Sequence, residues 1–218
     1  MRFKKYICAM VAILTVFALT ACSSRSLFQI LAATEKIDTS KFSYINEDAG
    51  FGIIYPEDYN TLTSEEINTL MAVVIEYIAS AFSDPAQMEE AMQKSIPVSI
   101  TMKHPITYVE GVNAGINIIV QKYPVIVINA VDAANAGIEE ANKQGAGVMT
   151  LEKATAIKID NKNAAVADST TTVYGMDSIG KQYYIFNNGY IAIISLAAGD
   201  EAELSELSKI IDTIQFIK

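Results

Sequence analysis

Apolar residues recur along this chain with a helical period in some segments and with strand alternation in others. In residues 63–82 they fall at i, i+3, i+4 and i+7, which places them on one face of an α-helix. Thr63 and Glu66 form a capping box at its start. The pattern predicts a helix over 63–82 that covers a core with Ile67, Leu70, Met71, Val74, Ile78 and Phe82.

Three further helices are expected. A short one over 85–94 has Asp84 as its N-cap and Pro85 at its first helical position. Another over 128–144 has helical apolar spacing and Gly145 as its C-cap. A closing helix over 200–214 has acidic residues in its first turn, where they interact favourably with the helix dipole. Its apolar face consists of Leu204, Leu207, Ile210, Ile211 and Ile214.

Alternating apolar residues predict strands in the first half of the chain. Segments 42–46 and 51–55 form an expected hairpin around the turn 47–50, and Pro56 ends the second strand. Strands are also expected over 97–103 and 115–123, and residues 125–128 fit either a strand or a helix.

The pattern in the second half of the chain predicts a meander of four strands over 149–159, 164–174, 181–186 and 190–197. The turns between them are expected at 160–163, 175–180 and 187–189. Consecutive strands joined by short turns run antiparallel. Alternation places Tyr183 and Tyr184 on opposite faces, one in the core and the other half-exposed. The fold class is therefore α+β, with one antiparallel β-sheet and helices packed on both faces.

The N-terminus has the organisation of an export signal. Arg2, Lys4 and Lys5 precede an apolar run over 6–19, which is shorter than the roughly 20 residues that span a bilayer as a helix. The run ends in Leu-Thr-Ala-Cys, which resembles a bacterial lipobox, the motif that is cleaved before its cysteine after lipid is attached to the sulfur. We expect a signal peptide over 1–21 and lipidation at Cys22.

This interpretation removes both cysteines from thiol chemistry. Cys8 leaves with the signal peptide and Cys22 becomes a thioether, so the mature protein has no disulfide, cysteine nucleophile or cysteine metal ligand. Residues 22–41 form a lipidated tether whose apolar residues have near-helical spacing. A short helix on the membrane and one folded back on the domain both fit it. The domain proper covers 42–218.

The charge of the mature chain is strongly acidic. Three of the 16 basic residues lie in the signal peptide, which leaves 13 basic against 25 acidic residues. Such a chain repels nucleic acid and anionic lipid at long range. We therefore expect no nucleic-acid partner, and attachment to the membrane through the lipid on Cys22.

Catalytic motifs are weak. His104, the single histidine, precedes Pro105 at the end of an expected strand and is interpreted as a turn residue. Ser195 lies inside an apolar strand without a G-x-S-x-G motif. Adjacent carboxylates on a helix point apart, so the four carboxylate pairs are interpreted as solvated faces. These pairs are Glu57-Asp58, Glu65-Glu66, Glu89-Glu90 and Glu139-Glu140.

Two further segments resemble a calcium loop and a phosphate loop but lack the residues that such loops require. Residues 160–163 lack the spaced acidic pattern of a calcium loop and are explained by a turn between strands. Residues 145–147 lack the Gly-Lys-Ser/Thr sequence of a phosphate loop. We expect no metal ion, no cofactor and no catalytic residue.

The segment Phe-Gly-Ile-Ile-Tyr-Pro-Glu-Asp-Tyr over 51–59 resembles the opening of proteins with a PsbP/Mog1-like fold. Segments 115–120, 157–165 and 183–198 and the closing helix follow in the same order, so the resemblance covers 42–218. Tyr59 stands where tryptophan is commoner, and the helical insertion over 63–94 is long. The resemblance implies a binding or accessory domain rather than an enzyme, and it assigns no binding residue.

Together these features predict a membrane-anchored lipoprotein on the extracytoplasmic side, with a non-enzymatic binding or accessory domain for a protein partner or small ligand. The alternative is a carboxylate-dependent envelope hydrolase. Two convergent buried carboxylates in a deep pocket favour the hydrolase, whereas a shallow face with exposed aromatic residues favours binding.

Overall fold

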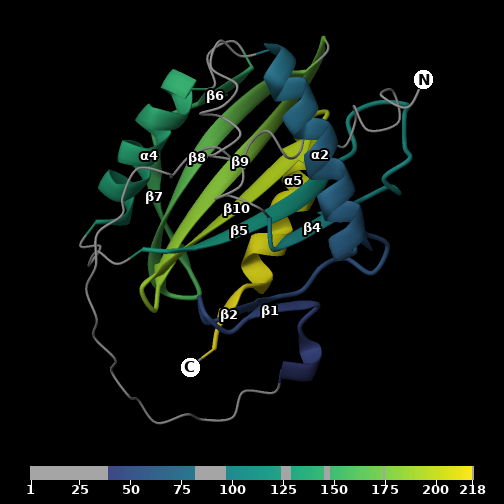
Figure 1. Ribbon diagram of the computed structural model, residues 1–218. Coiled ribbons are helices and arrows are strands. Elements are labelled where there is room, and N and C mark those ends of the chain that lie inside the picture. The colour runs from purple at the N-terminus through teal and green to yellow at the C-terminus, as the bar shows by residue number, and fades with distance from the viewer. Residues whose placement is uncertain (1–38, 82–96, 124–128, 145–147, 174, 218) are drawn as a thin grey trace.

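The computed structural model describes residues 39–81, 97–123, 129–144, 148–173 and 175–217 (Figure 1). Its helices are α2 (Ser64–Ala81), α4 (Ala130–Gln144) and α5 (Glu201–Ser208), with 3₁₀ turns η2 (Thr39–Lys41) and η3 (Lys209–Thr213). Its strands are β1 (Tyr44–Asn46), β2 (Phe51–Ile53), β3 (Asn60–Thr61), β4 (Ser99–Met102), β5 (Gly115–Lys122), β6 (Met149–Leu151), β7 (Thr155–Ile159), β8 (Lys162–Val173), β9 (Met176–Asn187), β10 (Tyr190–Ala198) and β11 (Gln215–Phe216).

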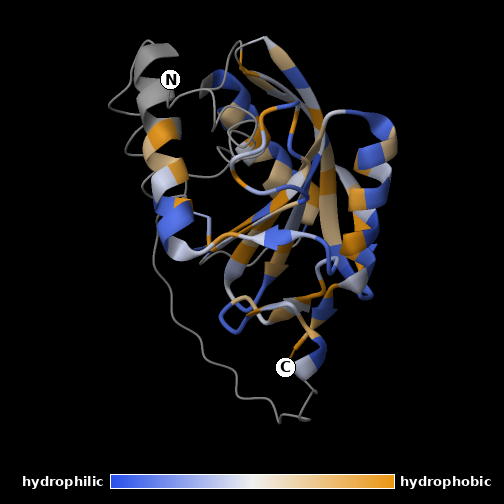
Figure 2. Ribbon diagram, turned by 90° about the vertical axis from the view of Figure 1, so that its right-hand side faces the viewer, coloured by the Kyte–Doolittle hydropathy of each residue, from blue (hydrophilic) through white to orange (hydrophobic). Residues whose placement is uncertain are grey.

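A large antiparallel sheet with helices on both faces forms the body of the protein. Its strand order is β3-β4-β5-β10-β9-β8-β6, and β7 also pairs with β8. One face packs against α2 and α4 and the other against α5 and η3, so two apolar cores lie on opposite sides of the sheet. Figure 2 shows α2 and α5 on opposite sides. The predicted α+β class is confirmed.

The opening hairpin forms a sheet of its own, which differs from the single sheet expected. β1 pairs with β2 as the predicted hairpin, with Tyr44 opposite Ile53. β11, at the end of the chain, adds to the other edge of β2, with Phe216 opposite Phe51. β2 lies between two strands and all three of its residues are buried, because Phe51 and Ile53 pack into the core that contains α5 and η3. Residues far apart in sequence thus close the small sheet, at the lower end of the molecule in Figure 1.

The predicted start of the helix over 63–82 is confirmed. The Thr63 N–H donates to Glu66 Oε2 at 2.8 Å and the Glu66 N–H to Thr63 Oγ1 at 3.3 Å, which is the capping box of α2. The closing helix is shorter than predicted, because the α-helix ends at Ser208 and tightens into η3. η3 still buries Ile210 and Ile211, so the apolar face continues.

The strand predicted over 149–159 is wrong, because the segment forms two strands. β6 and β7 both pair with β8, and residues 152–154 separate them. The Ala154 N–H donates to Asn135 Oδ1 of α4 at 2.8 Å. This N–H is therefore bonded to a helix side chain and does not extend the ladder of a continuous strand.

The turn predicted at 175–180 is also wrong. β9 begins at Met176, and Gly175, with φ of 75°, lies in the turn itself. Gly180 belongs to the ladder, opposite Ser169 and Ala197. The turn predicted at 160–163 is shorter than expected, because Asp160 and Asn161 take positive φ angles and β8 begins at Lys162.

Tyr183 and Tyr184 lie on opposite faces as expected, but both are buried, with exposures of 5% and 0%. The prediction of a half-exposed tyrosine is wrong because helices cover both faces of the sheet, so each ring enters one of the two cores.

Several predictions fall outside the described residues. They are the signal peptide over 1–21, Cys22 and the tether as far as residue 38, the helix over 85–94, the segment 125–128 and the C-cap Gly145. Among the helices that the structure describes, none is long and apolar enough to cross a membrane.

Candidate functional site: an acidic cavity beside α5

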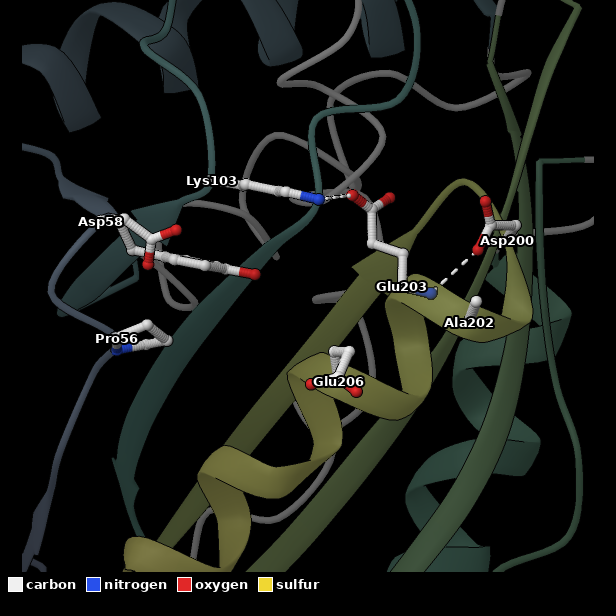
Figure 3. A pocket seen from close by; sticks show the side chains of 8 residues that line it. Pro56, Asp58, Lys103, Asp200, Ala202, Glu203 and Glu206 are labelled. Carbon is white, nitrogen blue, oxygen red and sulfur yellow. Dashed lines mark hydrogen bonds and ion pairs between the residues drawn. The ribbon is translucent and has the colours of Figure 1, made fainter.

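A cavity of about 540 Å³ lies beside the first turns of α5 (Figure 3). Three segments far apart in sequence line it: the loop after β2, the residue after β4, and the start of α5. We call it the acidic cavity, and its lining residues are Pro56, Asp58, Tyr59, Lys103, Asp200, Ala202, Glu203 and Glu206.

Local hydrogen bonds place these segments. The Tyr59 N–H donates to the Pro56 carbonyl at 3.1 Å, which turns the loop after β2 and brings Tyr59 to the cavity. Asp200 is the N-cap of α5, and its side chain accepts from the Glu203 N–H at 2.9 Å. The helix start therefore fixes the backbone from which Glu203 reaches the cavity.

An ion pair crosses the cavity between β4 and α5. Lys103 Nζ lies 2.7 Å from Glu203 Oε1, and a dashed line in Figure 3 marks this ion pair. The other oxygen of Glu203 accepts from the Gly199 N–H at 3.3 Å. The hydrogen bond to Glu203 raises the pKa of Lys103 above its ordinary value, and burial opposes this. Both oxygens of Glu203 are thus engaged within the fold.

Tyr59 provides the aromatic wall of the cavity. Burial of its half-covered ring raises the pKa of the hydroxyl, the Lys103 ammonium opposes that rise, and the carboxylates of Glu203, Asp58 and Glu206 add to it. The hydroxyl therefore stays protonated at neutral pH and is a hydrogen-bond donor in a negative environment.

Four carboxylates and one ammonium group line the acidic cavity. Glu206 pairs with Lys209 at 2.6 Å, and Asp200 caps its helix, so three of the four carboxylates already have structural partners. Asp58 is exposed and has no ion pair among the described residues. The arrangement attracts cations, but it does not form the pair of convergent buried carboxylates that the hydrolase alternative requires.

Of the residues that the sequence analysis considered for catalysis or binding, only Asp58 lines the acidic cavity. His104 stacks on Tyr108 with ring centroids 4.3 Å apart, and the side chain of Asn113 bonds both the N–H and the carbonyl of His104. It is a structured turn residue, as expected. Ser195 is buried in β10.

The carboxylate pairs are not brought together. Asp58 lines the acidic cavity, whereas its neighbour Glu57 is not among the lining residues. Glu65-Glu66 begins α2, and in the pair on α4 Glu139 pairs with Lys143 at 2.9 Å. Glu89-Glu90 lies outside the described residues.

Sequence reasoning did not identify the acidic cavity. The only available signal was the spacing of Asp200, Glu203 and Glu206, which places them around the start of one helix. Lys103 and Tyr59 carry no signal, because only the fold brings the end of β4 and the loop after β2 to α5. Within the described part of the chain, no group of three or more His, Cys, Asp or Glu residues is arranged to hold a metal ion.

Comparisons with known proteins find similarity only to solved structures, and this similarity concerns the fold alone. A scan against protein-family models and a search of curated proteins both find no match. Among solved structures, the chain is similar to cyanobacterial PsbP from Synechocystis, with 11% identity, 85% of this chain and 98% of that chain covered, and a TM-score of 0.49.

Two further solved structures are similar over shorter spans. LpqN, described as involved in cell envelope biogenesis of Mycobacterium tuberculosis, has 11% identity over 78% of this chain and 87% of that chain, with a TM-score of 0.47. A Pseudomonas aeruginosa protein of unknown function has 20% identity over 52% of this chain and 78% of that chain, with a TM-score of 0.41. Membership of the PsbP family stays a prediction, and these likenesses carry no conclusion about activity.

Proposed function

We propose that this protein is a lipoprotein anchored through Cys22 on the extracytoplasmic side of the membrane, and that its domain binds a partner without catalysing a reaction. The anchor rests on the basic residues, the short apolar run and the Leu-Thr-Ala-Cys motif at the N-terminus. Two acyl chains hold a protein on a membrane far more firmly than one, so the domain works at the membrane surface.

The observation that carries the binding role is the state of the carboxylates in the acidic cavity. Glu203 uses both oxygens within the fold, Glu206 has Lys209, and Asp200 caps α5. A glycosidase needs two carboxylates free to exchange protons or attack the substrate. These three carboxylates already have partners within the fold. Their charge can therefore attract a partner, but they are not free to act as an acid and a base.

The partner carries a positively charged group. Among the described residues, the only ammonium group lining the acidic cavity is already paired with Glu203, so the remaining carboxylates present a net negative surface around Asp58. Lysine or arginine side chains of a protein segment fit this surface, because carboxylates attract them and steer their approach. Tyr59 adds an aromatic ring beside which a cation can rest.

The anchor is tested in a bacterial host that lipidates its exported proteins, by membrane fractionation and mass spectrometry of the N-terminal peptide. Wild type is expected in the membrane fraction with a diacylglyceryl group on Cys22, and Cys22→Ala in the soluble extracytoplasmic fraction. An unmodified wild-type peptide that begins at Met1 overturns the anchor.

The acidic cavity is tested separately, by titrating the purified domain with a hexalysine peptide and following backbone amide shifts by NMR at low salt. Shifts are expected at Asp58, Tyr59 and Glu203, and Asp58→Asn combined with Glu206→Gln should weaken binding by about tenfold, the effect of about 1.4 kcal/mol. Glu139→Gln, on the solvent-facing side of α4, is the matched control. Equal binding by the double variant and the control contradicts a role for the cavity.

A further inference from the structure

The small sheet buries one face in the core and turns the other away from it. Phe51 and Ile53 of β2 enter the core that contains α5 and η3, so alternation points Gly52 and Ile54 the opposite way. Ile45 of β1 and Gln215 of β11 lie directly opposite Gly52 and share this second face. We call it the outer face, and its residues are Phe42, Ile45, Gly52, Ile54, Gln215 and Ile217.

Apolar side chains reach solvent on the outer face. Ile54 is 37% exposed, and Phe42, Ile45 and Ile217 are half-buried. The Ile54 N–H donates to Thr213 Oγ1 at 3.0 Å, which holds the backbone from which this side chain leaves the sheet. Folding therefore leaves four large apolar side chains partly in water on one face. A partner that removes them from water gains the free energy of burying apolar surface.

Phe42 occupies the place where Gly52 has no side chain. A Cβ on Gly52 would lie 2.6–2.8 Å from three carbons of the Phe42 ring, so the ring rests directly on the strand backbone. Lys41 Nζ stands 5.1 Å from the centroid of the same ring and donates to Gln215 Oε1 at 2.6 Å. The chain therefore enters the domain across the outer face and is fixed to it.

The outer face is also where the chain arrives from the proposed anchor. η2 directly precedes Phe42 and lies beside β1, as the purple end of the ribbon in Figure 1 shows. Residues 23–38 separate Cys22 from Thr39, and a chain of this length spans at most about 60 Å. Such a link makes contact between domain and bilayer intramolecular, at an effective concentration on the order of millimolar. Weak apolar contacts are then sufficient to dock the domain.

The charge of the outer face allows this contact. None of its six residues is acidic, and Lys41 stands at its edge. Asp160 lies beside β11, where its Oδ2 accepts from the Phe216 N–H at 2.8 Å. The mature chain as a whole is acidic, so charge attraction does not draw it to the membrane. A face without carboxylates can nevertheless meet the bilayer without the cost of burying a charge.

We infer that the outer face docks on the lipid bilayer that carries the anchor, with Phe42, Ile45 and Ile54 at the boundary between headgroups and acyl chains. This inference rests on the proposed anchor at Cys22. Apolar side chains with one lysine at their edge match such a boundary, because the bilayer covers the apolar groups while the ammonium stays among the headgroups.

Docking orients the acidic cavity. α5 begins at this cavity, and η3 leads from its end into β11 of the small sheet. Eight α-helical and five 3₁₀ residues rise about 20 Å, so the start of α5 is held away from the docked face. The carboxylates around Asp200 therefore lie on the side of the domain that a partner approaches from solution.

The test uses the chain 22–218, coupled through the Cys22 thiol to a maleimide lipid in vesicles of phosphatidylcholine brominated along its acyl chains. This chain has no other cysteine and no tryptophan, so one introduced tryptophan reports its own position. Bromolipid should quench the fluorescence of Ile54→Trp strongly and that of Val109→Trp hardly at all. Val109 is 56% exposed in the loop before β5, at the opposite end of the large sheet from Asn187, and is the matched control.

A charge on the outer face should release the domain. Added to Ile54→Trp, Ile45→Asp should lower the docked population by about tenfold, because the bilayer boundary excludes a carboxylate. Ile45→Thr keeps the β-branched shape and should lower it less, and Val109→Asp should leave the quenching unchanged. Circular dichroism checks that each variant folds, and Ile45→Thr alone decides the comparison if Ile45→Asp does not.

The outcomes separate this inference from the anchor. The lipid is coupled chemically, so the quenching does not depend on whether a host lipidates Cys22, which mass spectrometry tests. Equal quenching of the two tryptophans, or quenching of Ile54→Trp that the substitutions of Ile45 leave unchanged, overturns docking. Shielding of Ile54→Trp that appears only at high protein density also overturns it, because a second copy of the chain then covers the outer face.

Discussion

Asn187, at the end of β9, donates from its side-chain Nδ2 to the carbonyl of Ala49 at 2.7 Å. Ala49 lies in the turn between β1 and β2, so this bond joins the large sheet to the small one. Lys162 Nζ donates to the other end of the same amide at 2.8 Å, which fixes the orientation of Asn187. A single side chain therefore connects the start of β8, 25 residues away, with the turn between β1 and β2, 138 residues away.

Asn187→Ala is expected to lower the free energy of unfolding by about 1–2 kcal/mol, because it leaves the Ala49 carbonyl without its side-chain donor. Urea unfolding followed by circular dichroism measures the change. Asn163→Ala, an exposed asparagine on β8, is the control and should change stability by less than about 0.5 kcal/mol. Equal losses in the two variants would show that the bond contributes nothing specific.

Gly180→Ala should destabilise the large sheet. The added Cβ would lie 2.3 Å from the Leu196 carbonyl oxygen of the neighbouring strand, a contact that only a shift of backbone relieves. We expect a loss of about 2–3 kcal/mol. At Gly111 the nearest atom to an added Cβ is 3.8 Å away, so Gly111→Ala should be neutral or slightly stabilising. Chemical unfolding of both variants checks the difference.

The periodic parts of the fold were predictable from sequence, and the reasons are local. The Thr63 and Glu66 capping box and the alternation in β5 and β10 depend on neighbouring residues alone. Gly180 was misinterpreted because a glycine in a strand looks like a turn signal until the close approach of Leu196 is known. The break between β6 and β7 depends on Asn135, which sits on a helix.

The candidate site was less predictable than the fold. Lys103 and Glu203 are paired across 100 residues of sequence, and neither belongs to a motif. Gln182 and Ser195 each have a buried polar atom without a partner among the described residues, and the sequence does not reveal this, because alternation shows only that a position is buried.

The ionisation of Tyr59 should report the charges of the acidic cavity. The Lys103 ammonium lowers the pKa of Tyr59 and the Glu203 carboxylate raises it. Lys103→Met should therefore raise the pKa of Tyr59 further, and Glu203→Gln should lower it. Titration by NMR with labelled tyrosine measures both shifts. Glu139→Gln is the control, and shifts of the same sign in the two cavity variants would contradict the arrangement.

Alkaline pH should destabilise the protein through its buried tyrosines. Burial raises the pKa of Tyr55 and of Tyr184 in the folded state, whereas in the unfolded chain both hydroxyls ionise near pH 10. Below that pH both states keep the proton and the two groups contribute nothing pH-dependent. Above it the unfolded state loses protons that the folded state retains, so stability falls as pH rises.

The fall should approach about 1.4 kcal/mol per pH unit for each such tyrosine. Tyr55→Phe removes one of them at the cost of the bond to Ser99 Oγ at 2.9 Å, so it should lower stability at pH 8 but flatten the decline between pH 10 and 11. Tyr108→Phe, in the loop between β4 and β5, is the matched control. Urea unfolding at pH 8, 10 and 11 measures the slopes, and an unchanged slope in Tyr55→Phe would contradict the burial of this hydroxyl.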